Sequence, residues 1–260
     1  MRLGPVSVRL HRPANGDGGR RPAVLWIHGG GFVIGNARQE DARCRELARA
    51  LGAVVAAVDY RLAPEHPFPV PLHDCHDALA WLADRDEVDA TRIAIAGSSA
   101  GGGLAAGLAL LARERGGVRP VFQLLVYPML DDRTAVRHCE YERDLRLWNS
   151  RSNRFGWRSY LGRDPGSDGV SALAAPARTE DLSGLPPAWI GVGSVDLFAD
   201  EDVEFARRLR AAGVACELCV VDGAYHGFDV VHRTAPISRE FHAAQVDALA
   251  RALGAVGRDR

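Results

Sequence analysis

The sequence predicts an open, mostly parallel β-sheet with helices on both of its faces. Short apolar runs recur along the chain and alternate with longer segments whose apolar residues follow a helical period. The runs at 23–28 and 54–58 are apolar almost throughout, as expected for strands of a parallel sheet that is covered on both sides. Regular alternation of strands with helices is typical of α/β folds.

The strands are expected in order along the whole chain. The first, at 6–10, alternates apolar and polar residues like an edge strand, and the glycine-rich stretch at 15–19 predicts a turn after it. The later strands are expected at 23–28, 54–58, 93–96, 121–126, 188–192 and 215–221.

Helices are predicted between these strands from apolar residues spaced three or four positions apart. The first of them ends at Gly52, a residue type that favours the end of a helix. The helical apolar positions fall in 44–51, 75–82 and 104–111, and later helices are expected at about 200–212 and 238–253. The segment 59–69 contains several prolines and is therefore expected to be a shaped loop.

The segment 131–187 differs in composition from the rest of the chain. It is rich in Arg, Asp and Ser, shows no strand pattern, and carries an amphipathic helix predicted at 149–161. We interpret 1–260 as a single domain in which 131–187 is a cap-like insertion over the sheet. Its aromatic side chains are Trp148, Phe155, Trp157 and Tyr160.

Composition limits the classes of protein to which the chain can belong. A length of 260 residues suits one large α/β domain, and 47% hydrophobic with 25% charged residues is typical of a globular protein with a sizeable core. The net charge is −1 without a basic block, so neither nucleic acid nor a stable membrane association is expected. The N-terminus lacks a signal-peptide pattern, which indicates a cytoplasmic protein.

Two patterns resemble metal or redox sites, and both have a simpler interpretation. Cys216 and Cys219 form a C-x-x-C, but they lie in a predicted strand, where residues three apart point to opposite faces. His73 and His76 lie on a predicted helix without the H-E-x-x-H pattern. We therefore expect no metal, and nothing in the sequence calls for a cofactor.

The strand at 93–96 leads into Gly97-Ser98-Ser99-Ala100-Gly101, a G-x-S-x-G pattern between a strand and a helix. A serine in so tight a turn adopts a strained backbone, so the positions two before and two after it must be almost free of side chain. This geometry exposes the Ser99 hydroxyl and directs the Ala100 N–H at a developing oxyanion. Alone, the pattern also fits an ordinary turn.

Two further polar residues follow strands at the same predicted edge of the sheet. Asp196 comes after the strand at 188–192, and His226 lies in a glycine-flanked loop after the strand at 215–221. The order Ser99, Asp196, His226 is the one expected of an α/β-hydrolase triad. Asp196 could instead cap the following helix, and Asp200 competes with it for either role. The combination predicts a serine hydrolase in which His226, oriented by Asp196, activates Ser99 to attack an ester.

Several motifs together resemble the bacterial hormone-sensitive-lipase-like esterases over nearly the whole chain. They are His28-Gly-Gly-Gly-Phe32, Asp59-Tyr-Arg-Leu-Ala-Pro-Glu65, Gly97-Ser-Ser-Ala-Gly-Gly102, Tyr127-Pro-Met-Leu-Asp131 and Tyr225-His-Gly-Phe228. The resemblance implies that Ser99, His226 and Asp196 are nucleophile, base and acid. It further implies an oxyanion hole formed by the amides of Gly30, Gly31 and Ala100, with His28 holding the glycine loop in shape.

The chain departs from that family in three places. Position 98 is Ser where Asp is usual. The segment after Asp196 reads Leu-Phe-Ala-Asp, where many members have a proline, and the sheet begins at what resembles the family's second strand. The first strand and the N-terminal cap helices are therefore expected to be missing.

We expect consequences for the substrate pocket. Phe32 and the aromatics Trp148, Phe155, Trp157 and Tyr160 are predicted to contact substrate, with the last four forming an incomplete wall that leaves an exposed apolar patch. That patch favours a homodimer, and the incomplete wall favours short acyl chains.

Other classes of function stay open at this point. Gly29–Gly31 after a strand could belong to a dinucleotide loop of an NAD(P)-binding oxidoreductase, although G-x-G-x-x-G is absent. A non-catalytic ligand-binding protein could also carry a hydrolase-like fold. A small-molecule ester as substrate is the favoured prediction.

Overall fold

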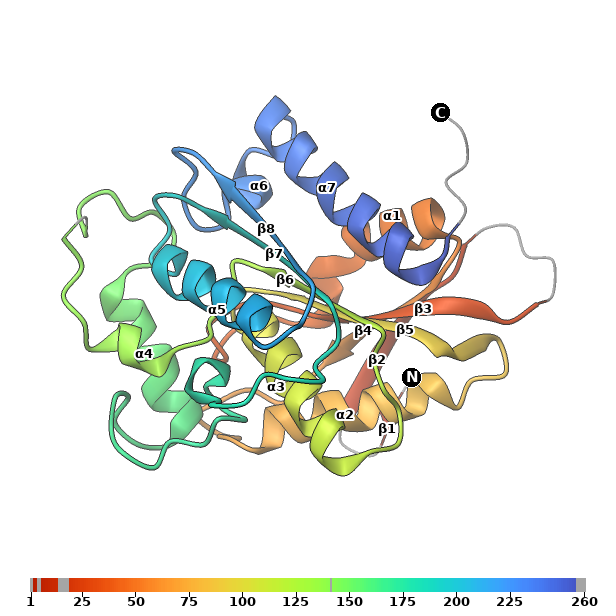
Figure 1. Cartoon of the computed structure of the whole chain (residues 1–260), viewed down its shortest axis with the longest axis horizontal. Helices are drawn as coiled ribbons and strands as arrows, with labels where there is room; N and C mark the ends of the chain where they lie inside the picture. The colour runs from red at the N-terminus through yellow and green to blue at the C-terminus, as the bar shows by residue number, and fades with distance from the viewer. Residues whose placement is uncertain (1, 4–5, 14–18, 141, 256–260) are drawn as a thin grey trace.

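The computed structural model describes residues 2–3, 6–13, 19–140 and 142–255, and its strands form one eight-stranded sheet (Figure 1). The strand order is β1-β2-β4-β3-β5-β6-β7-β8. The pairs β1–β2 and β2–β4 are antiparallel, and all other pairs are parallel. The strands are β1 (Arg2–Leu3), β2 (Val6–His11), β3 (Arg21–Ile27), β4 (Val54–Asp59), β5 (Val88–Ser98), β6 (Phe122–Val126), β7 (Ala188–Gly193) and β8 (Cys216–Val221).

The start of the sheet differs from the prediction. The sequence indicated that the first strand was missing, whereas a two-residue strand, β1, pairs with the beginning of β2. A strand this short has no periodic pattern to detect. In the described part of the chain every helix follows β3. The turn predicted at 15–19 falls largely outside the described residues.

Alternation along the central strands divides the core into two layers. Along β3, Leu25 and Ile27 belong to one buried cluster, and Val24 and Trp26 belong to another on the opposite face of the sheet. All four side chains are fully buried. The apolar run of β3 therefore reflects a strand with a hydrophobic layer on each side, as the sequence predicted.

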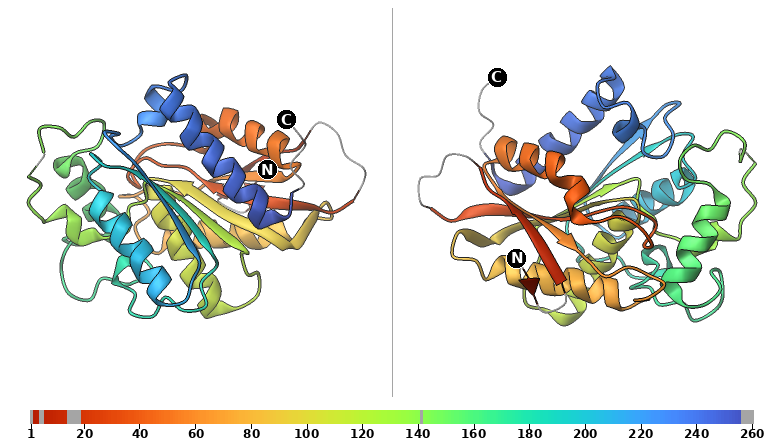
Figure 2. Two further views of the ribbon diagram at one scale, coloured as in Figure 1. Left: turned by 45° about the horizontal axis from the view of Figure 1, so that its top comes forward. Right: turned by 180° about the vertical axis from the view of Figure 1, so that it is seen from behind.

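The helices cover both faces of the sheet (Figures 1 and 2). On one face lie α1 (Asp41–Leu51) and α7 (Pro236–Leu253), and on the other lie α2 (Val70–Ala83), α3 (Ala100–Arg115) and α5 (Ala199–Ala211). A one-turn helix, α6 (Phe228–Val231), precedes α7. Short 3₁₀ turns occupy η1 (Ala37–Glu40), η2 (Asp132–Ala135) and η3 (Pro176–Arg178). In the part of the chain that the structure describes, no helix has the length and apolar character needed to cross a membrane.

The segment between β6 and β7 contains η2, α4 (Ser150–Leu161) and η3, and no strand among its described residues. The α4 helix begins where the Asn149 side chain accepts a hydrogen bond from the Ser152 N–H, and it ends at left-handed Gly162. Its Tyr160 carbonyl accepts from the N–H of Phe68, in the loop after β4. Contact with that loop holds α4 over one end of the sheet.

Glu201 anchors the beginning of this segment to α5. Its buried carboxyl group accepts hydrogen bonds from the N–H groups of Leu130 (2.7 Å) and Asp131 (3.2 Å) and contacts the Thr134 hydroxyl. Burial raises the pKa of Glu201 to about 8, although the three hydrogen bonds oppose that rise. The group is therefore mainly protonated at neutral pH.

We expect the free energy of unfolding to fall as the pH rises from about 5 to about 8. In this range the folded state holds a proton on Glu201 that the unfolded chain has already released, so the slope of stability against pH is negative. Glu201→Gln mimics the protonated form and should flatten the profile. Urea unfolding at several pH values measures it, with the exposed Glu204→Gln on the same helix as control. An unchanged slope in Glu201→Gln would contradict the assignment.

Candidate active site

Ser99 lies at the junction of β5 and α3, where the chain turns sharply. Its φ of 56° is in the left-handed region, which a residue with a side chain adopts only under strain. A Cβ at position 97 would lie 2.3 Å from the Gly101 carbonyl oxygen, and one at position 101 would lie 2.1 Å from the Ile27 oxygen. The two glycines of the G-x-S-x-G pattern are thus required by close backbone approach.

The structure brings Ser99, His226 and Asp196 together. The Nε2 atom of His226 lies 3.0 Å from the Ser99 Oγ, and its Nδ1 lies 2.8 Å from an Asp196 carboxylate oxygen. Because a carboxylate only accepts, Nδ1 carries the proton and Nε2 is left to accept from the serine hydroxyl. All three residues are buried.

Asp196 is held in place by the backbone as well as by the histidine. It follows β7, and its other carboxylate oxygen accepts from the Phe198 N–H at 3.0 Å. Asp200, the competing acid in the sequence, is exposed in the first turn of α5. The structure therefore pairs Asp196, and not Asp200, with His226.

The glycine loop after β3 lies beside Ser99. Gly30 (φ 118°) and Gly31 (φ 58°) both adopt backbone conformations that favour glycine. Within the described residues, the N–H groups of Gly30, Gly31 and Ala100 have no protein acceptor. Gly30 and Gly31 line the same cavity as Ser99, and Ala100 begins α3, whose N-terminus favours negative charge.

His28 stabilises the glycine loop. Its imidazole stacks on the Tyr60 ring at a centroid distance of 4.2 Å, and its Nδ1 donates to the Gly29 carbonyl at 2.7 Å. The Tyr60 hydroxyl in turn donates to the His28 carbonyl at 3.0 Å. Burial lowers the pKa of His28, which favours the neutral ring.

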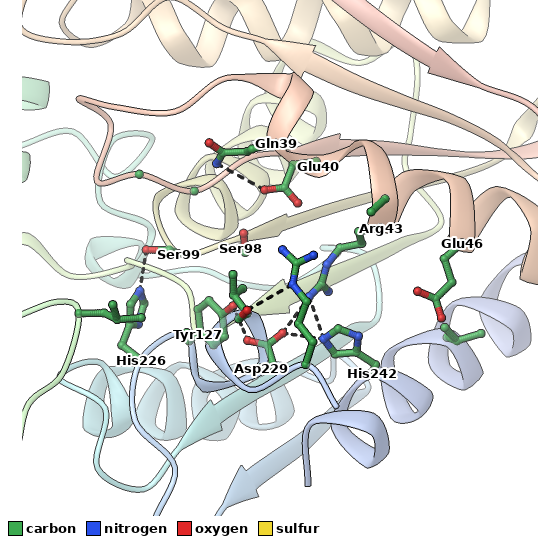
Figure 3. Close-up of a pocket in the computed structure, with 18 of the residues that line it drawn as sticks. Gln39, Glu40, Arg43, Glu46, Ser98, Ser99, Tyr127, His226, Asp229 and His242 are labelled. Atoms are coloured by element: carbon green, nitrogen blue, oxygen red, sulfur yellow. Dashed lines mark hydrogen bonds and ion pairs between the residues drawn. The ribbon is translucent and has the colours of Figure 1, made fainter. Parts of the chain in front are cut away.

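A cavity of about 840 Å³ opens at Ser99 (Figure 3). Next to Ser99 and His226 it is lined by Leu147 and Trp148 from the segment between β6 and β7. Its other part extends between α1 and α7, where Figure 3 shows charged side chains gathered around Asp229. The cavity thus joins a site with apolar walls to a polar region.

The five aromatic residues predicted to contact substrate fall into different places. Trp148 alone among them lines the cavity. Phe32, Trp157 and Tyr160 are fully buried, with Phe32 stacked on Tyr160 at 4.1 Å, and Phe155 is 59% exposed. The prediction of an exposed aromatic wall is therefore wrong for Trp157 and Tyr160, because Phe32 from the glycine loop supplies their packing partner. The homodimer, which was inferred from that patch, stays a prediction.

Sequence reasoning missed the polar group that lies behind His226. Tyr127 and Asp229 line the cavity, and the Tyr127 hydroxyl donates to Asp229 at 2.8 Å. Tyr127 begins the motif that ends at Asp131 but was given no role, and Asp229 directly follows the motif that ends at Phe228. A carboxylate in an otherwise apolar helix turn was the available signal.

No cluster of potential metal ligands occurs among the described residues. Cys216 and Cys219 are free thiols on β8, the last strand of the sheet. The structure thus places neither C-x-x-C nor the His73 pair in a candidate metal centre.

Fold and site together define an α/β hydrolase, and comparisons with known proteins agree. Residues 24–230 match the family described by its alpha/beta hydrolase fold, and the chain belongs to it. It is 38% identical over 229 residues to esterase LipI of Mycobacterium tuberculosis, covering 86% of this chain and 71% of that protein. It is 34% identical to an ethyl acetate hydrolase of Pseudomonas putida, with 86% of this chain and 71% of that protein covered.

A solved structure described as a bacterial heroin esterase superimposes with a TM-score of 0.90. That similarity has 43% sequence identity and covers 95% of this chain and 80% of the other. The expected resemblance to hormone-sensitive-lipase-like esterases is confirmed, and the protein is a carboxylic ester hydrolase. The oxidoreductase and the non-catalytic alternatives are set aside.

Gly31→Ala should impair catalysis, whereas Gly52→Ala should not. The two glycines share a left-handed backbone (φ 58° and 60°), so alanine should cost each about 1 kcal/mol of stability. Only at position 31 would the new methyl group meet a neighbour, the Trp148 ring at 2.1 Å. We expect kcat to fall by more than about tenfold in Gly31→Ala alone, because the glycine loop must shift. Equal kcat values in the two variants would refute this.

Proposed function

We propose that the protein hydrolyses short-chain carboxylic esters through a Ser99–His226–Asp196 triad and a covalent acyl-enzyme. The observation that carries the proposal is the position of His226, which is hydrogen-bonded to Ser99 through one ring nitrogen and to Asp196 through the other. In this tautomer the imidazole can accept the serine proton as the hydroxyl attacks.

The reaction proceeds in two halves. Ser99 Oγ forms a bond to the ester carbonyl carbon while its proton passes to His226 Nε2, and collapse of the tetrahedral intermediate expels the alcohol, which takes that proton. Water then attacks the acyl-enzyme, again giving up a proton to His226. Release of the carboxylic acid returns Ser99 to its hydroxyl form.

The oxyanion of each tetrahedral intermediate is assigned to the N–H groups of Gly30, Gly31 and Ala100. Free donors beside the nucleophile support this assignment, since a fixed donor stabilises developing charge more strongly than mobile water does. The stacked His28 keeps the loop in place without adding charge.

Short acyl chains are proposed because the segment between β6 and β7 contributes few apolar side chains to the cavity. Phe32, Trp157 and Tyr160 pack against one another in the interior and leave Leu147 and Trp148 as the apolar residues of the segment that face the cavity. Each buried methylene contributes about 0.8 kcal/mol to the binding free energy. A small apolar wall therefore stabilises only the first few methylenes of an acyl chain. The similarity to an ethyl acetate hydrolase supports the same choice.

Ser99→Ala should lower kcat for p-nitrophenyl acetate by more than about 10⁴-fold, because no other group can form the acyl-enzyme. Ser98 is the neighbouring serine and lines the same cavity, so Ser98→Ala serves as the matched control and should keep most of the activity. Circular dichroism checks that both variants fold. A Ser99→Ala protein with more than about a hundredth of the wild-type kcat would exclude Ser99 as nucleophile.

The value of kcat/KM should be greatest at the short end of a series of p-nitrophenyl esters from acetate to dodecanoate. It should decline once the acyl chain extends beyond the contacts with Leu147 and Trp148. Assays below the solubility limit of each ester provide the comparison. A maximum at decanoate or dodecanoate would show that a longer apolar wall exists.

A further inference from the structure

We propose that Asp229, acting through Tyr127, positions the imidazole of His226 for proton transfer. The inference rests on the proposed role of His226 as the base. Asp229 is fully buried, lies three residues after His226 and is outside the triad.

The backbone after His226 is held locally only by the few hydrogen bonds of one helical turn. Gly227 adopts a left-handed conformation (φ 70°), and α6 then runs for only four residues. A helix of one turn is unstable alone, because the ordering of its backbone is not offset by enough hydrogen bonds. The position of this segment must therefore be set by contacts of its side chains.

Asp229 supplies such contacts with three parts of the fold (Figure 3). Its carboxylate accepts from the Tyr127 hydroxyl at 2.8 Å, from Arg43 Nη2 at 2.8 Å and from His242 Nε2 at 2.9 Å. These donors come from the end of β6, from α1 and from α7. One carboxylate thus ties the turn after His226 to the end of β6 and to the two helices that cover one face of the sheet.

The carboxylate stays ionised at every pH used for an esterase assay. Burial by itself would raise the pKa of Asp229, but the hydrogen bond from His242, the charge of Arg43 and the hydrogen bond from Tyr127 lower it to about 2. Removal of the charge or of a donor would leave buried polar groups without partners.

The donors are themselves held in place. Arg43 also donates to Gln245 at 2.6 Å, and its guanidinium lies 5.0 Å from the Trp26 ring centroid. His242 Nε2 is only 3.1 Å from Arg43 Nη2, because both donate to the same Asp229 oxygen. Convergence on a single oxygen explains why two donors lie so close.

Tyr127 connects this carboxylate to the catalytic histidine. Its ring meets the His226 imidazole edge-on at 4.7 Å, and Phe198 meets the same imidazole from another direction at 5.2 Å. The backbone of Tyr127 donates to the Gly191 carbonyl at 2.7 Å, and the preceding Val126 accepts from the Ser99 N–H at 2.8 Å. The backbone of Tyr127 is therefore held beside Ser99, and its hydroxyl group is held at Asp229.

Asp229 cannot take the place of the triad acid. The His226 Nδ1 is already bonded to Asp196, and both Asp229 oxygens accept from other donors. Its influence on His226 must pass through Tyr127 and the turn. A displacement of the base by about 1 Å is enough to slow a reaction on the order of a hundredfold, so a small loosening should be measurable.

The test compares Asp229→Asn and Tyr127→Phe with Asp132→Asn as the matched control. Asp132 is an equally buried carboxylate with three donors, two from Arg178 and one from the Gly166 N–H, but it is not among the residues that line the cavity. The pre-steady-state burst of p-nitrophenol from p-nitrophenyl acetate counts the active sites. The acylation rate constant for each counted site, KM and the urea midpoint are then measured.

We expect Asp229→Asn to lower the acylation rate constant per active site by roughly ten- to a hundredfold with little change in KM. Tyr127→Phe, which keeps the ring beside His226 and loses one hydrogen bond, should show a smaller loss of the same kind. Asp132→Asn should lower the urea midpoint and leave the acylation rate per active site within about twofold.

Equal acylation rates per active site in Asp229→Asn and Asp132→Asn would overturn the proposal and reduce Asp229 to a structural residue. If Asp229→Asn does not fold, the proposal is tested with Tyr127→Phe alone. It is then overturned if Tyr127→Phe acylates as fast as the wild type. The wild-type burst and its loss in Ser99→Ala are established first, so a wrong nucleophile is recognised separately.

Discussion

The close approach of α3 to the end of β3 is the constraint on which this site depends. Gly101 meets the backbone of Ile27 so closely that no side chain fits between them, and Ser99 is thereby forced into its left-handed conformation. Hydrogen bonds hold the strained residue on both sides, since its N–H donates to Val126 and its carbonyl accepts from Met129 and Gly103. Ser99 faces the cavity because the surrounding backbone leaves it no other conformation.

Features that depend on local pattern could be predicted from the sequence. The buried strands, the helices between them and the residues that meet at Ser99 follow from apolar periodicity and from the rule that parallel strands end at one edge of a sheet. The spacing of the G-x-S-x-G motif is enough to explain why Gly97 and Gly101 are glycines. Asp196 could be favoured but not separated from Asp200, because both lie within one turn of a helix start and only the long-range contact with His226 distinguishes them.

Features that depend on tertiary contact could not be predicted. The two residues of β1 and the four of α6 are too short to show a period. The aromatic residues of α4 were expected at the cavity, but Phe32 draws Trp157 and Tyr160 into the core, a contact between segments far apart in the chain. The partners of Asp229 come from three distant elements, so the residues next to it in the sequence do not predict them.

The buried carboxylate of Asp229 also has an evolutionary consequence. Arg43, Tyr127 and His242 all donate to this one group, so a substitution of Asp229 removes an acceptor from all three, and a substitution of any donor weakens the stabilisation of a buried charge. Pairs of substitutions within such a set are strongly non-additive. Single substitutions in this set should therefore be selected against. Related sequences should either keep these four residues together or exchange them together.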